Sequence, residues 1–111
     1  MTIKNINPTS FNWDDFVSEK FDGETGYATI KTQTIGTIKI RQVQYSINYL
    51  ADHWCDKGHI VFVISGQLII EHKDNTEIIL NSGSTYVVGD NSMAHKAKST
   101  VGATVLIVDN T

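Results

Sequence analysis

Short apolar segments closed by turn residues make up most of the chain after residue 23. The segments are rich in Ile, Val, Thr and Tyr, which favour strands, and pairs such as Ser65-Gly66, Asp74-Asn75 and Ser82-Gly83 follow them as turn signals. No stretch carries a long helical stripe. We therefore expect an all-β sandwich or barrel of antiparallel strands. The expected strands cover residues 24–35, 37–47, 59–64, 67–72, 76–81, 84–88, 95–99 and 103–109.

Residues 9–21, "TSFNWDDFVSEKF", fit two structures. Thr9 or Ser10 could cap a short helix. Alternatively, Trp13 and Phe16 could pin an irregular arm across the sheet. The arm is the preferred interpretation.

Composition narrows the class of protein. A chain of 111 residues with 41% hydrophobic and 19% charged residues is expected to form one globular domain. A net charge of −3 gives no basic surface for nucleic acid or anionic lipid, which leaves a small molecule as the expected partner. One cysteine and an N-terminus without an apolar leader favour the cytoplasm. The longest apolar run, "IVFVI", is too short to span a bilayer.

Candidate metal ligands gather in the segment "DHWCDKGH" (52–59). In an extended chain His53 and Cys55 point to the same face, because residues two apart do so. A turn before His59 then lets this side chain return to that face. A later antiparallel strand that begins at His95 could complete the group.

These residues carry a resemblance to a known family. "HWCDKGHIVFVISG" resembles the first signature of the cupin superfamily, and "GSTYVVGDNSMAH" is similar to the second. The stretches "GETGYA", "YLADHWCDKGH" and "GATVLIVD" also resemble a small bacterial group with a DHCW-motif cupin fold. The resemblance implies a single-domain cupin jelly-roll barrel (1–111), with an N-terminal arm over 1–22 and the barrel over 23–109, and it favours a homodimer.

The resemblance also implies a metal site at His53, Cys55, His59 and His95. Cys55 stands where the family has its second histidine and His59 where it has glutamate, and one extra residue precedes His95. Imidazole and thiolate ligands suit a divalent transition metal, with zinc as the first choice and iron or nickel as alternatives. Four ligands would make a closed zinc site, whereas a displaced ligand would leave a position for water or substrate.

Three further residues are candidates for binding a substrate. Counting back by twos from the first candidate ligand places Arg41 and Tyr45 in the barrel, where Arg41 could bind a carboxylate. A bulge at 46–48 would instead turn Arg41 to solvent. Tyr86 lies on the strand that precedes His95. His72, at an expected hairpin end, is interpreted as a solvated imidazole without function.

Two classes of function remain open. The first is a metal-dependent enzyme in which the ion acts as a Lewis acid or binds oxygen, while Arg41 and a tyrosine orient a small carboxylate-bearing molecule. The second is a non-catalytic binding or sensor module, with a closed structural metal site or a metal-free pocket for a small molecule. The absence of the usual glutamate removes an obvious base and weighs against the first class.

Overall fold

The computed structural model describes residues 2–111, and it confirms the all-β fold. No helix in this range is long and apolar enough to cross a membrane. The elements are η1 (Trp13–Asp15), β1 (Glu19–Asp22), β2 (Tyr27–Ile35), β3 (Ile38–Tyr45), β4 (Tyr49–Leu50), β5 (His59–His72), β6 (Glu77–Asn81), β7 (Thr85–Val88), β8 (His95–Ser99) and β9 (Ala103–Asn110).

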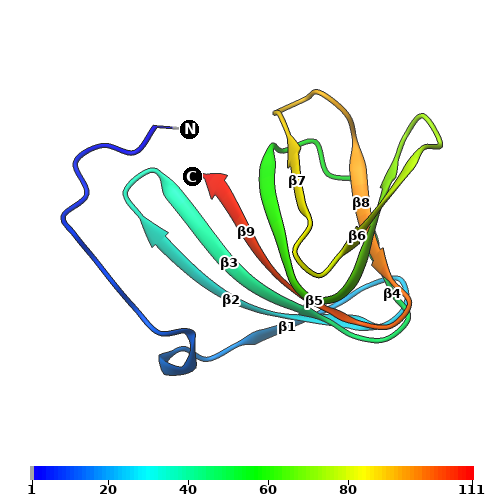
Figure 1. The fold of residues 1–111 in the computed structure, drawn as a ribbon, viewed down its shortest axis with the longest axis horizontal. Coiled ribbons are helices and arrows are strands. Elements are labelled where there is room, and N and C mark those ends of the chain that lie inside the picture. The colour runs from blue at the N-terminus through cyan, green and yellow to red at the C-terminus, as the bar shows by residue number, and fades with distance from the viewer. Residues whose placement is uncertain (1) are drawn as a thin grey trace.

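Two antiparallel layers curl around one interior (Figure 1). One layer holds β1, β2, β3, β9, the first half of β5 and β7, and the other holds β4, β8, the second half of β5 and β6. Strand β5 belongs to both layers and joins them. The fold is therefore a jelly roll whose mouth lies where β5, β8 and β9 begin or end.

Strand β5 corrects one expectation from the sequence. Residues 59–64 and 67–72 were expected to be separate strands ended by Ser65-Gly66, but they form one strand of 14 residues. A register shift between Val63 and Ser65 bends this strand, and Gly66 follows with φ 77°. A Cβ at Gly66 would lie 2.1 Å from the Gly102 carbonyl oxygen. The glycine thus serves a bulge that passes the strand between layers, since bulges bend strands without ending them.

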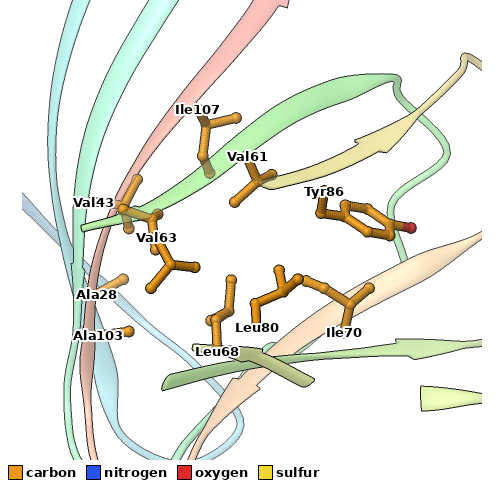
Figure 2. Packing of buried hydrophobic residues seen from close by; sticks show 11 residues of the cluster. Ala28, Val43, Val61, Val63, Leu68, Ile70, Leu80, Tyr86, Ala103 and Ile107 are labelled. Atoms are coloured by element: carbon orange, nitrogen blue, oxygen red, sulfur yellow. The ribbon is translucent and has the colours of Figure 1, made fainter. Parts of the chain in front are cut away.

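The core fills the space between the layers (Figure 2). Strand β9 shows most clearly how the sequence forms this core. Ala103, Val105 and Ile107 are buried, while the residues between them are partly exposed. Such alternation follows from the two-residue period of side chains along a strand. The apolar cluster consists of Ala28, Val43, Val61, Val63, Leu68, Ile70, Leu80, Tyr86, Ala103, Val105 and Ile107.

The N-terminal segment is an irregular arm with one short turn. The turn η1 is capped by Asn12, whose side chain accepts from the Asp14 amide, so Thr9 and Ser10 do not cap a helix. The Trp13 ring contacts those of Phe11 and Phe16 edge to face. These ring contacts lie within the segment itself and do not cross the sheet. Its last residues, Glu19–Asp22, form strand β1 paired with β2, which was not expected from the sequence.

Candidate metal centre

Three of the four predicted metal ligands come together at the mouth of the barrel. One ligand atom each from Cys55, His59 and His95 lies within 4.8 Å of the others. Cys55 comes from the β4–β5 loop, His59 begins β5 and His95 begins β8. The Cys55 amide donates to the His95 carbonyl (2.8 Å) and the His95 amide donates to the Cys55 carbonyl (3.0 Å). This pair of backbone hydrogen bonds holds the loop beside β8.

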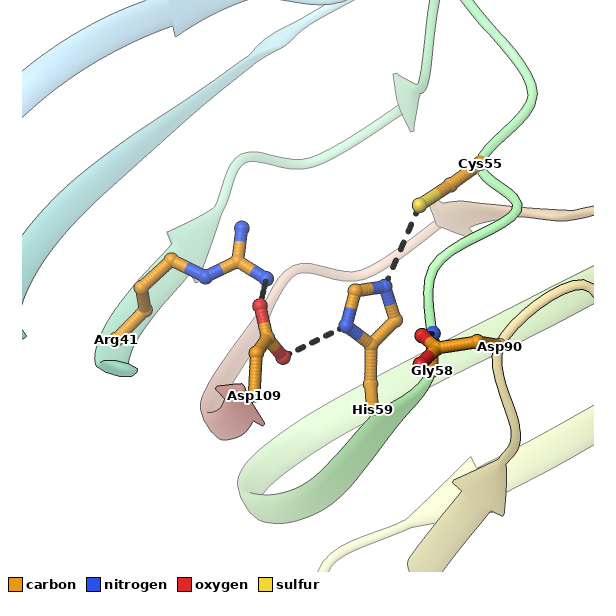
Figure 3. Close-up of polar contacts among 6 residues, drawn as sticks. All are labelled: Arg41, Cys55, Gly58, His59, Asp90 and Asp109. Carbon is orange, nitrogen blue, oxygen red and sulfur yellow. Dashed lines mark hydrogen bonds and ion pairs between the residues drawn. The ribbon is translucent and has the colours of Figure 1, made fainter. Parts of the chain in front are cut away.

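The neighbouring turn fixes the approach of the chain to His59. The Gly58 amide donates to a carboxylate oxygen of Asp90 at 2.7 Å (Figure 3). A Cβ at Gly58 would lie 2.8 Å from the Asp90 backbone nitrogen. A glycine therefore lets the two segments approach closely enough for His59 to enter the strand in its observed position.

The His59 ring is oriented by a carboxylate behind it. Nδ1–H of His59 donates to Oδ1 of Asp109 at 2.7 Å, and Oδ2 of Asp109 pairs with Arg41 at 2.7 Å (Figure 3). An ionised carboxylate only accepts, so Nδ1 of His59 carries a proton and Nε2 is the nitrogen that faces the other two residues. That Nε2 lies 3.4 Å from Sγ of Cys55. A carboxylate behind an imidazole is the arrangement that orients metal-bound histidines.

Asp109 is suited to remain ionised in this position. Burial acts to raise its pKa, but the hydrogen bond from His59 and the positive charge of Arg41 outweigh that effect and lower the pKa below 3.8. The carboxylate is only 4% exposed. It therefore places a fixed negative charge behind His59 at neutral pH.

His95 presents a free ring nitrogen to the same point. Its Nδ1–H donates to the Met93 carbonyl oxygen at 2.9 Å, while Nε2 is buried and has no hydrogen-bond partner among residues 2–111. Burial lowers the His95 pKa below 6.5, against the opposing effect of the Met93 hydrogen bond. The ring is therefore neutral at neutral pH, as a metal ligand must be. The residue inserted before His95 has not turned this side chain away from the group.

His53 lies outside this group. Its Nδ1 is 2.6 Å from a carboxylate oxygen of Asp52, and its side chain is 78% exposed. Side chains two apart share a face only in an extended chain, but residues 52–54 contain a bend and only Cys55 forms a bridge in this loop. Side chains two apart in a bent loop need not share a face, and His53 and Cys55 do not meet here.

A cavity of about 520 Å³ opens beside the three ligands. Arg41, Tyr45 and Tyr86, the predicted substrate-binding residues, all line it. The sequence left open whether Arg41 points into the barrel or to solvent, and its place in the cavity lining shows that it points into the barrel. Its Nη2 pairs with Asp109, whereas its Nε is buried and unpartnered within the described part of the chain. Asp109 therefore does not use all of the N–H donors of this guanidinium.

Tyr45 packs beside Tyr49, with ring centroids 4.8 Å apart. Burial is the main cause that raises the pKa of Tyr45, Tyr49 adds to it, and Arg41 opposes it. The phenol thus stays protonated and neutral over the physiological range. It can give a hydrogen bond to a molecule in the cavity but not a negative charge.

Two residues change role relative to the sequence prediction. Asp109 was not identified as a site residue, although it continues the buried alternation of Val105 and Ile107 and is the first polar residue on that face. A buried carboxylate at the end of an apolar face is the signal that could have found it. His72 was interpreted as solvated, but it is 8% exposed and hydrogen-bonds to Tyr86 and Thr76.

Comparisons with known proteins agree on the fold alone. No model of a known protein family matches the sequence, and no curated protein matches it. An RmlC-like cupin from Shewanella frigidimarina is 12% identical, with a TM-score of 0.74 over 95% of this chain and 92% of that one. A predicted oxalate decarboxylase from Thermotoga maritima is 7% identical, with a TM-score of 0.75 over 93% and 100%. Fe(II)-HppE, in a complex with an alternative substrate, is 14% identical, with a TM-score of 0.75 over 95% of this chain and 62% of that one.

The layers, the bent shared strand and the cavity at the mouth define a jelly-roll protein with a candidate ligand site inside the roll. The similar structures make the architecture specific. This chain has the cupin fold.

Proposed function

We propose that this cupin binds a divalent transition-metal ion through Cys55, His59 and His95, and takes a small carboxylate-bearing molecule in the adjoining cavity. One observation carries the proposal. Both imidazoles use Nδ1–H in hydrogen bonds to protein oxygens, which leaves two Nε2 lone pairs to meet a thiol within 4.8 Å.

The donor set fits such an ion. The buried Nε2 of His95 has no protein partner within the described residues, and an unsatisfied buried acceptor costs about 1–3 kcal/mol. Coordination would satisfy this nitrogen and would hold Cys55 as its thiolate. Soft and borderline donors favour zinc, iron or nickel over magnesium or calcium, and zinc is our first expectation. Such an ion supplies Lewis acidity to a molecule bound beside it.

The number of converging ligands favours an exchangeable position. Structural zinc sites are closed by four protein ligands, whereas catalytic sites keep three and one open position. Here three protein ligands converge beside a cavity. The Arg41 guanidinium, which pairs with Asp109 through Nη2 alone, and the neutral Tyr45 phenol line the cavity and can donate to a carboxylate there. The iron(II) named for HppE supports metal use by this fold, but it does not define a reaction for this chain.

A second candidate is a binding or sensor module that catalyses nothing. Asp109, the carboxylate in contact with a candidate ligand, is already paired with His59 and Arg41. It is therefore poorly placed to act as a free base. This favours binding without turnover over proton abstraction.

Metal analysis of untagged protein tests the proposal. We expect one ion per chain in the wild type, a large loss in Cys55→Ala and His95→Ala, and full retention in His53→Ala, which is the matched control because it removes an imidazole outside the group. Equal loss in His53→Ala would restore a four-ligand site. Full retention in Cys55→Ala and His95→Ala would refute the metal centre.

Cobalt substitution separates an exchangeable metal site from a closed, structural one. Thiolate-containing bands are expected for Co(II) in the wild type and should disappear in Cys55→Ser. Band shifts on adding acetate or oxalate would indicate an exchangeable position. Bands that ignore both anions would favour the closed, structural site.

A further inference from the structure

A chain of hydrogen bonds runs from the exterior to a tyrosine that lines the cavity. The Thr76 hydroxyl lies 2.6 Å from Oδ1 of Asp74 and 3.1 Å from Nδ1 of His72. On the other side of the ring, Nε2 of His72 lies 2.8 Å from the Tyr86 hydroxyl. His72 and Tyr86 are 8% and 7% exposed. Nothing in the proposed metal centre explains why an imidazole is buried here.

Asp74, at the outer end of this series of hydrogen bonds, determines which partner donates in each bond. The hydrogen bonds from the hydroxyl and amide of Thr76 lower the pKa of Asp74 below 3.8, so its carboxylate is ionised and can only accept. The Thr76 hydroxyl must then give its proton to Asp74. Its oxygen therefore accepts from Nδ1–H of His72.

The direction of the bond between Thr76 and His72 also determines the direction of the bond between His72 and Tyr86. When the His72 ring carries a single proton, that proton lies on Nδ1, and Nε2 accepts from the Tyr86 hydroxyl 2.8 Å away. The single phenolic proton is then in use. The oxygen of Tyr86 retains only acceptor capacity for any other partner.

We propose that this chain makes Tyr86 a hydrogen-bond acceptor towards the cavity, which therefore selects a small molecule with an anionic group facing Arg41 and a hydrogen-bond donor, such as a hydroxyl or ammonium group, facing Tyr86. This inference rests on the proposed function for its premise that the cavity binds a small molecule. It does not rest on the metal.

The sheet register places Arg41 and Tyr86 at opposite ends of one row of cross-strand neighbours. Arg41 pairs with Ile107, Ile107 with Val61, and Val61 with Tyr86 across four neighbouring strands. The outer members of the row are separated by three strand spacings, roughly 14 Å before curvature. Ile107 and Val61 between them are buried and apolar. A matching molecule is thus polar at both ends and apolar in the middle, because a polar group over this floor would lose its hydrogen bonds.

The first test measures the direction of the chain without any ligand. Nitrogen-15 shifts of the His72 ring in the full-length protein distinguish the two neutral tautomers. We expect the Nδ1–H form in the wild type and in Thr76→Ser, which keeps the hydroxyl. Thr76→Val should shift the ring towards the Nε2–H form. An Nε2–H ring in the wild type would overturn the inference.

The second test measures the ligand preference that follows. The probes are 4-hydroxybutanoate and 6-hydroxyhexanoate, each compared with its O-methyl ether, which keeps the anion and loses the donor. We expect the wild type and Thr76→Ser to bind at least one hydroxy acid about tenfold more tightly than its ether, because a buried acceptor would otherwise lose its partner. In Thr76→Val the ratio should fall to within about threefold.

Calorimetry on metal-free and zinc-loaded protein keeps the two proposals apart. Binding of neither hydroxy acid in either form, or an unchanged ratio in Thr76→Val, would overturn the ligand class. If the protein does not hold zinc but still binds the hydroxy acid more tightly than its ether, the metal centre is refuted and this inference stands.

Discussion

Asp109 is the residue whose replacement most directly tests how the site is built. In Asp109→Asn the side chain keeps its shape but loses the charge that faces both His59 and Arg41, each 2.7 Å away. The amide oxygen can still accept from His59, but it orients the ring less firmly and makes Nε2 less basic. Replacing a group behind a metal ligand typically weakens metal binding 10- to 100-fold, or about 1.4–2.8 kcal/mol.

The same replacement also affects the metal-free fold. Removing one member of a buried ion pair costs about 3–5 kcal/mol. The Arg41 side chain is 22% exposed and can recover some hydration, so we expect the free energy of unfolding to fall by about 2–3 kcal/mol. Urea unfolding of the metal-free protein measures this loss apart from the metal.

A double-mutant cycle separates the two effects. Arg41→Met removes the cation but leaves the contact between Asp109 and His59. In Arg41→Met/Asp109→Asn no buried charge is left without its partner, so the free energy of unfolding should recover by about 1–2 kcal/mol relative to Asp109→Asn. The loss of metal affinity, measured by competition with a chelator, should persist. A dissociation constant for Asp109→Asn within twofold of the wild type would refute the role assigned to Asp109.

Three further predictions concern the bend, the hairpin and the exterior. Gly66→Ala should lower the free energy of unfolding by at least about 2 kcal/mol in urea, because its φ is positive and its Cβ would meet the Gly102 carbonyl. Asp74 has a pKa lowered by Thr76, so its contribution to stability is present above pH 3.8 and is lost as the pH falls through the folded-state pKa; NMR titration of Thr76→Val should show this pKa rising. We expect a homodimer formed through the exposed apolar face around Phe62, which is 42% exposed, and Phe62→Lys should give monomers in analytical ultracentrifugation.

Most of the strand pattern could be predicted from sequence because those strands carry their own period and turn signals, whereas β1 and the two-residue β4 were not expected. Strands β6, β7 and β8 agree with the expected segments within one residue at each end. The continuity of β5 could not be predicted from the sequence, because Ser65-Gly66 is equally suited to a turn and to a bulge. The choice depends on the close approach of Gly102, a contact between residues distant in sequence.

The same difference between local and long-range contacts explains which site residues could be predicted from the sequence. Cys55, His59 and His95 were predicted from motif spacing, which reflects how this fold arranges its strands. His72 was assigned to solvent from its charged neighbours, yet cross-strand pairing with β8 and the Tyr86 hydroxyl enclose it. Burial of a polar side chain depends on which strands cover it, and the local sequence does not record this.

The placement of His53 bears on the class of function. Had its ring joined Cys55, His59 and His95, four protein ligands would have closed the site, and a structural role would have followed. Instead Asp52 holds the ring in the exposed loop. The three candidate ligands face the cavity that Arg41 also lines. If the three residues hold an ion, an open position beside the Arg41 cation would suit an anionic molecule that exchanges with solvent, so the loop conformation at 52–54 favours the proposed ligand-binding role over a structural one.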